Sequence, residues 1–143
     1  MPLILRIVLL CSLALSALAQ AAPEAPQAAP SDCGEYSQAQ MRACLAGKVQ
    51  ESEKALRQAE KNMRAALLAW DEDRLYGIRA ASALKAANRA FVSYRRDTCA
   101  LAQSLSGGAA GNAAELRRLT CEATLNGRRA AELEQQAAGL PAR

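Results

Sequence analysis

Three segments of the chain carry apolar or small residues at alternating steps of three and four, and this spacing constrains the fold most. Such a repeat places its members on one face of an α-helix, and that face must be buried. The segments span residues 38–70, 73–105 and 113–138. Their members are Leu45, Val49, Ser52, Leu56, Ala59, Met63, Ala66 and Trp70; then Leu84, Ala87, Phe91, Tyr94, Thr98, Leu101 and Leu105; and last Leu116, Leu119, Ala123, Asn126, Ala130, Leu133 and Ala137.

Two short connections separate these segments, and no segment has the alternating pattern of a β-strand. The acidic run Asp71-Glu72-Asp73 suits a turn and the start of a helix, because carboxylates stabilise helix N-termini. The Gly-rich run 107–112 is poor helix and good turn. We therefore expect an all-α fold: a long antiparallel helical hairpin with a third helix packed back along it.

The first 32 residues differ in composition from the rest. Residues 1–19 are typical of a secretory signal peptide, with Arg6, an apolar run and a small-x-small site at Ala17-Leu18-Ala19. Residues 20–32 hold three Pro and no large apolar residue, which predicts a disordered Ala/Pro-rich leader. The helical domain would span 33–138, followed by a C-terminal tail at 139–143. A periplasmic or secreted protein is the expected product.

Charge and hydropathy exclude some partners. No segment after the signal approaches the roughly 20 apolar residues of a membrane span. Loss of Arg6 with the signal lowers the formal net charge of +4 by one. This mild positive charge does not by itself imply nucleic-acid binding.

Four cysteines remain after the signal, and an even number in an exported chain predicts two disulfides. The tight cysteine pairs of metal sites are absent and the chain has no histidine, so we expect no metal or cofactor. A helical hairpin would permit either Cys99–Cys121 across the Gly-rich connection or Cys44–Cys99 across the acidic turn. We favour Cys33–Cys44 with Cys99–Cys121, although Cys121 lies off the third repeat.

The absence of histidine also removes the Ser-His and Cys-His pairs of nucleophilic enzymes, and no C-x-x-C redox motif is present. We therefore predict that the protein is not an enzyme.

The stretch from Ala87 to Arg95 (ANRAFVSYR), with Cys99, Gly107-Gly108 and a last block holding Cys121, Arg129 and Leu133, resembles the LprI-like lysozyme inhibitor N-terminal domain family of exported bacterial proteins. The resemblance covers about residues 33–135. Phe91 stands where Trp is usual, Arg96 where Asp is usual, and Asn126 where Thr is usual. The resemblance implies a disulfide-bonded helical domain in the periplasm or outside the cell, with lysozyme as a possible target.

Several residues are candidates for partner contacts. Asp71, Glu72 and Asp73 form an acidic tip that could enter or cover the cleft of lysozyme, a basic protein, or simply cap a helix. Arg95 and Arg129 could bind a carboxylate or a glycan, or pair with local acids. Phe91, Tyr94 and Leu133 are expected to pack in the core.

These observations favour an exported non-enzymatic binding protein, with inhibition of lysozyme as the first hypothesis. The alternative hypothesis is a structural or adaptor protein of the cell envelope that binds another envelope protein.

Overall fold

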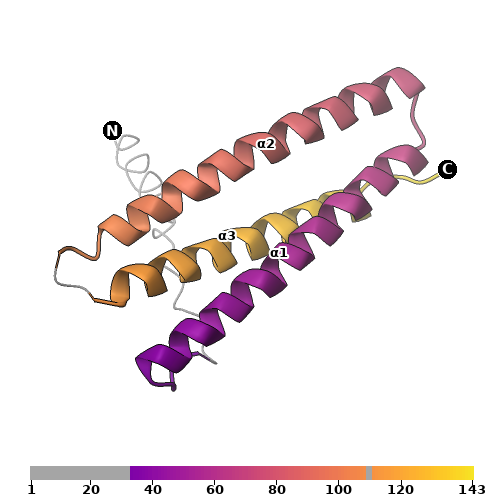
Figure 1. Cartoon of the computed structure of the whole chain (residues 1–143). Helices are drawn as coiled ribbons and strands as arrows, with labels where there is room; N and C mark the ends of the chain where they lie inside the picture. Colours follow the sequence, from indigo (N-terminus) through magenta and orange to yellow (C-terminus); the bar gives the residue numbers. More distant parts are fainter. Residues whose placement is uncertain (1–32, 109–110) are drawn as a thin grey trace, which may run out of the picture.

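A computed structural model describes residues 33–108 and 111–143, which form three α-helices (Figure 1). They are α1 (Gln38–Ala69), α2 (Arg74–Ser104) and α3 (Ala113–Ala138). Each boundary falls within one residue of its predicted position, and the all-α class is confirmed. The predicted signal peptide and leader lie outside the described residues. Among the described helices, none is long and apolar enough to cross a membrane.

Local sequence signals explain where the helices begin. Ahead of α1, the Ser37 backbone N–H donates to the Gln40 side chain at 3.2 Å, which forms part of a capping box. Ahead of α2, the Asp73 carboxylate accepts from the Leu75 backbone N–H at 2.7 Å. In the connection from α2 to α3, Gly107 and Gly111 have positive φ angles, which glycine adopts without steric cost.

The helices are not packed equally. Helices α1 and α3 run in the same direction and form the most extensive interface, while α2 runs in the opposite direction (Figure 1). Helix α2 packs mainly on α3, and it approaches α1 closely only near the connection at 70–73 (Figure 1). The antiparallel hairpin is therefore present, but the main interface joins the first and last helices.

Two clusters of buried side chains form the core. The larger one joins the C-terminal half of α1 to α2 and α3, and Met63, Trp70 and Phe91 pack against it. Its buried members are Leu56, Ala59, Leu67, Leu84, Ala130 and Leu133. The smaller one holds Cys33, Leu45 and Leu119. The predicted inward faces of α1 and α3 are thus confirmed.

The predicted inward face of α2 is wrong over its second half. Tyr94, Leu101 and Leu105 are 57%, 59% and 68% exposed, so the expectation that Tyr94 packs in the core is contradicted. Cys99, which is off the predicted repeat, is only 1% exposed. The bond to Cys121 requires Cys99 to face α3, and this rotates the repeat residues toward solvent.

Both predicted disulfides are confirmed. Cys33–Cys44 ties the chain before α1 to its first turns, and Cys99–Cys121 ties α2 to α3. The Cα atoms lie 5.8 Å and 5.5 Å apart, within the usual range for disulfides. Helix α3 continues without a break through Cys121, so the second bond lies on a flank of that helix.

Candidate functional site

A layer of polar side chains crosses the middle of the bundle. Asn126 has no solvent exposure and donates from Nδ2 to the Ser52 hydroxyl oxygen at 3.2 Å. Its Oδ1 accepts a hydrogen bond from the Arg95 guanidinium. Because these residues come from α3, α1 and α2, the layer links all three helices. Arg95, predicted as a partner contact, is directed into the bundle.

Arg95 also packs on the Phe91 ring. Its Cζ atom lies 5.9 Å from the ring centroid, within the range of a cation–π contact. The interaction holds the Phe91 ring from one side. Arg95 therefore connects the polar layer to the neighbouring aromatic residue.

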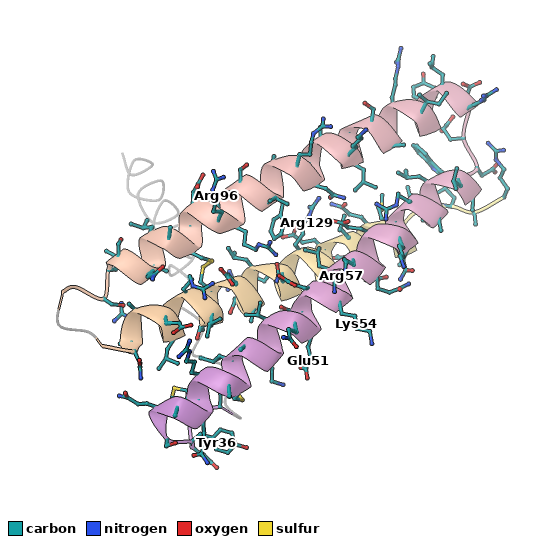
Figure 2. The ribbon with its side chains drawn as sticks, viewed as in Figure 1. Tyr36, Glu51, Lys54, Arg57, Arg96 and Arg129 are labelled. Carbon is teal, nitrogen blue, oxygen red and sulfur yellow. A yellow bond between two sulfur atoms is a disulfide. The ribbon has the colours of Figure 1, made fainter. Side chains whose placement is uncertain are left out.

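Arg129, the other predicted cation, lies on the side of α3 that faces α2 (Figure 2). It donates to Glu132 at 3.3 Å and to Asn88 at 3.4 Å, and its side chain is 17% exposed. Within the described part of the chain, its buried Nε has no hydrogen-bond partner, and the guanidinium is held by these two long contacts.

Arg129 lines a groove of about 450 Å³ between α2 and α3, which we call the α2–α3 groove. Phe91 and Tyr94 provide aromatic rings, and Arg128 and Glu132 add charge. The remaining lining is apolar: Ala87, Ala90 and Leu125. Because Tyr94 faces solvent, it lies at this surface and not in the core.

The three acids of the predicted tip have different roles in the structure. Asp73 caps α2, and the Glu72 carboxylate accepts from the Asp73 backbone N–H at 3.1 Å. Asp71 lies 3.9 Å from Arg143, and both side chains are well exposed. The alternative prediction, that the acidic run caps a helix, is therefore confirmed for Asp73. The Asp71 side chain stays exposed at the surface.

The end of the chain packs beside this acidic turn. The Asp71 N–H donates to the Pro141 carbonyl at 2.9 Å, and the Arg143 N–H donates to the Ala69 carbonyl at 3.0 Å. The Arg143 guanidinium also donates to the Glu72 backbone carbonyl. The two backbone bonds form an antiparallel bridge between Trp70 and Ala142, and with the guanidinium contact they hold the turn in place.

An apolar groove of about 350 Å³ opens next to the acidic turn, between the end of α1 and the start of α2; we call it the tip groove. Leu68 and Ile78 in its lining are 86% and 56% exposed. Charged residues surround this apolar floor: Arg64, Glu72, Asp73, Arg74 and Arg143. An apolar centre inside a charged rim is the usual composition of a protein-binding surface.

Sequence reasoning identified the acids of this site and missed its apolar floor. Leu68 and Ile78 lie on either side of the acidic run but off the predicted inward faces. Large apolar residues that no core explains are the signal that could have indicated the groove. Of the two predicted cations, Arg129 lines the α2–α3 groove, whereas Arg95 is directed into the bundle and lines neither groove.

An ion pair between Arg96 and Asp97 lies on the outer side of α2 (Figure 2). The hydrogen bond from Arg96 holds the pKa of Asp97 below its usual value. Both side chains are well exposed, and neither lines the tip groove or the α2–α3 groove.

The side chains at the two grooves suit recognition of a partner by its shape and charge. Among the described residues, no group of three or more His, Cys, Asp or Glu side chains could hold a metal ion.

Comparison with known protein families identifies a match. A model of the family described as "Lysozyme inhibitor LprI" matches residues 30–133, which is more than half of the chain. No curated protein and no solved structure matches the chain.

Proposed function

The chain belongs to the lysozyme inhibitor LprI family, and we propose that it is a non-enzymatic binding protein that inhibits lysozyme. We also propose that it acts in the periplasm or after secretion. Two disulfides support such a location, because they persist in oxidising compartments.

The tip groove is the observation that supports this proposal most directly. Its apolar floor supplies surface that a partner can bury, and burial of apolar surface is the dominant favourable term in most protein association. The acids Asp71 and Glu72 beside it would pair with cations of a basic enzyme, while Arg64, Arg74 and Arg143 in the rim limit the long-range attraction. The hydrogen bonds to Pro141 and from Arg143 hold the turn in place, which lowers the entropic cost of binding.

A lytic assay with c-type lysozyme tests the proposal. Purified oxidised protein at micromolar excess is expected to slow lysis of bacterial cells. The substitutions Leu68→Ser and Ile78→Ser together should weaken inhibition by about tenfold or more, because full burial of a Leu or Ile side chain contributes about 1.5–3 kcal/mol. The pair Leu101→Ser and Leu105→Ser is the matched control, since both leucines are exposed at the C-terminal end of α2, outside the tip groove.

A charge-reversal pair tests the two acids Asp71 and Glu72 separately. Asp71→Lys with Glu72→Lys should slow association with lysozyme, and the effect should shrink at high salt. The control is Glu35→Lys with Glu51→Lys, which changes the net charge equally at exposed positions outside the tip groove. No slowing of lysis by the unmodified protein, or equal loss in the test and control pairs, would contradict the proposal.

A further inference from the structure

We propose that the α2–α3 groove is a second binding site, which takes the C-terminal carboxylate of a peptide whose last side chain is apolar. It lies on a different part of the surface from the tip groove and shares no lining residue with it.

The incomplete hydrogen bonding of Arg129 points to an anionic ligand. A guanidinium has five N–H donors, arranged to bind both oxygens of a carboxylate. In the described residues, Arg129 makes contacts at 3.3 Å and 3.4 Å, and its buried Nε has no partner. Its side chain is 17% exposed, so few water molecules can reach it. A carboxylate in the groove would accept from the terminal guanidinium nitrogens, whose present contacts are long, because the buried Nε offers no surface that a ligand could reach.

Glu132 does not close the site to a second carboxylate. Its side chain is 61% exposed and touches Arg129 at 3.3 Å, so the pair is largely solvated and weak. Arg128 also lines the groove and keeps its net charge positive when Glu132 is ionised. Together the three side chains carry one positive charge in excess, which favours one monovalent anion.

The rest of the groove suits an apolar side chain. Ala87, Ala90 and Leu125 present methyl groups, and the ring of Phe91 is held from one side by Arg95. Tyr94 is 57% exposed and could cover a bound group with its ring. A sugar acid fits less well, because its hydroxyls would face methyl groups that offer no hydrogen bond. The volume of about 450 Å³ is within the range of small-ligand sites.

Titration of the full oxidised protein with N-acetyl-L-phenylalanine, followed by backbone amide NMR shifts, tests this site. Saturable shifts are expected in residues 87–94 and 125–132, with a millimolar Kd. N-acetyl-L-phenylalanine amide has the same side chain and acetyl group but lacks the carboxylate charge, and it should bind at least about tenfold more weakly. Equal binding of the acid and the amide, no saturable shifts, or shifts confined to other residues would overturn the proposal.

Two variants and one control connect the binding to the groove. Arg129→Gln should weaken the binding of N-acetyl-L-phenylalanine by about tenfold. Arg117 is an exposed cation of α3 outside the groove, so Arg117→Gln should leave the Kd unchanged. Because Arg129 is largely buried, Tyr94→Ser is the second variant: its side chain is exposed, the fold should be intact, and affinity should fall about threefold. Unchanged affinity in both variants would overturn the assignment.

N-acetylmuramic acid tests the competing ligand class. It carries a carboxylate on a sugar ring, and we expect it to bind more weakly than N-acetyl-L-phenylalanine. Tighter binding of the sugar acid would overturn the peptide assignment. Lysozyme is absent from these titrations, so their outcome is independent of the inhibition assay.

Discussion

The Arg95 guanidinium donates a hydrogen bond to Oδ1 of Asn126, a side chain with no solvent exposure. The same amide donates to the Ser52 hydroxyl, so one buried residue of α3 holds contacts to both other helices. A buried amide is costly when it lacks partners, and this cost disfavours alternative positions of the helices. The polar layer therefore contributes to the register of the bundle as well as to its stability.

Asn126→Ala should lower the free energy of unfolding by about 2–3 kcal/mol, because it removes two hydrogen bonds and leaves a small cavity. Urea denaturation followed by circular dichroism measures this loss. Gln135→Ala, an exposed amide on the same helix, is the control and should change stability by less than about 0.5 kcal/mol. A loss at Asn126 as small as at Gln135 would show that the layer does not stabilise the fold.

Two leucines test the observed rotation of α2. Leu133→Ala should cost about 3 kcal/mol, since Leu133 is fully buried in the larger core cluster. Leu101→Ala should cost less than about 0.5 kcal/mol, because Leu101 is 59% exposed. Thermal or urea unfolding of the two variants measures the difference. Similar losses at both positions would mean that α2 buries the face that its sequence repeat indicates.

Removal of the Cys99–Cys121 bond should release α2 selectively. Helix α2 has a smaller interface with the other helices than α1 and α3 have with each other, so the covalent bond supplies much of its attachment. In the chain-entropy model the bond contributes about 3 kcal/mol. Cys99→Ala with Cys121→Ala should raise amide hydrogen exchange throughout α2 more than in α1 or α3.

Cys33→Ala with Cys44→Ala is the matched control for this experiment. It should raise exchange mainly at the start of α1, because Cys33–Cys44 joins only that end of the helix. Uniform acceleration over all three helices in both variants would contradict a separate role for Cys99–Cys121.

Substitutions of Asp73 and Asp71 should change the free energy of unfolding by different amounts. Asp73→Ala removes the cap of α2 and should cost about 1 kcal/mol. Asp71→Ala removes an exposed 3.9 Å ion pair with Arg143 and should be nearly neutral. Chemical denaturation of both variants checks this. A larger loss at Asp71 would mean that the bonds of the turn, and not the cap, determine its stability.

The helix boundaries and both disulfides could be predicted from the sequence because they depend on local signals. These signals are the Gly-rich connection, the acidic turn, and the positions of Cys99 and Cys121 at nearly equal distances from the Gly-rich connection. Each of them involves residues that are close together in the sequence. The rotation of α2 could not be predicted from its repeat, because Phe91 and Leu101 belong to the same 3/4 spacing but differ in exposure. Their difference depends on Cys99 and Arg95, which contact residues of α3.

The charged part of the candidate site could be predicted from the sequence, but its groove could not, for a related reason. Charge runs such as 71–73 are apparent in a sequence, whereas the tip groove forms where α1, α2 and residue Arg143 come together. The pairing of residues 140–143 with the turn has no local signal either, since its backbone bonds join Ala69 and Asp71 to residues about 70 positions away. Such features require the three-dimensional arrangement.

Amide hydrogen exchange of the oxidised protein, with and without c-type lysozyme, tests the central claim most directly. We predict that lysozyme protects residues 67–78 at the tip groove and leaves the N-terminal half of α1 unchanged. Protection confined to other residues, or identical exchange with and without a saturating amount of lysozyme, would contradict the account.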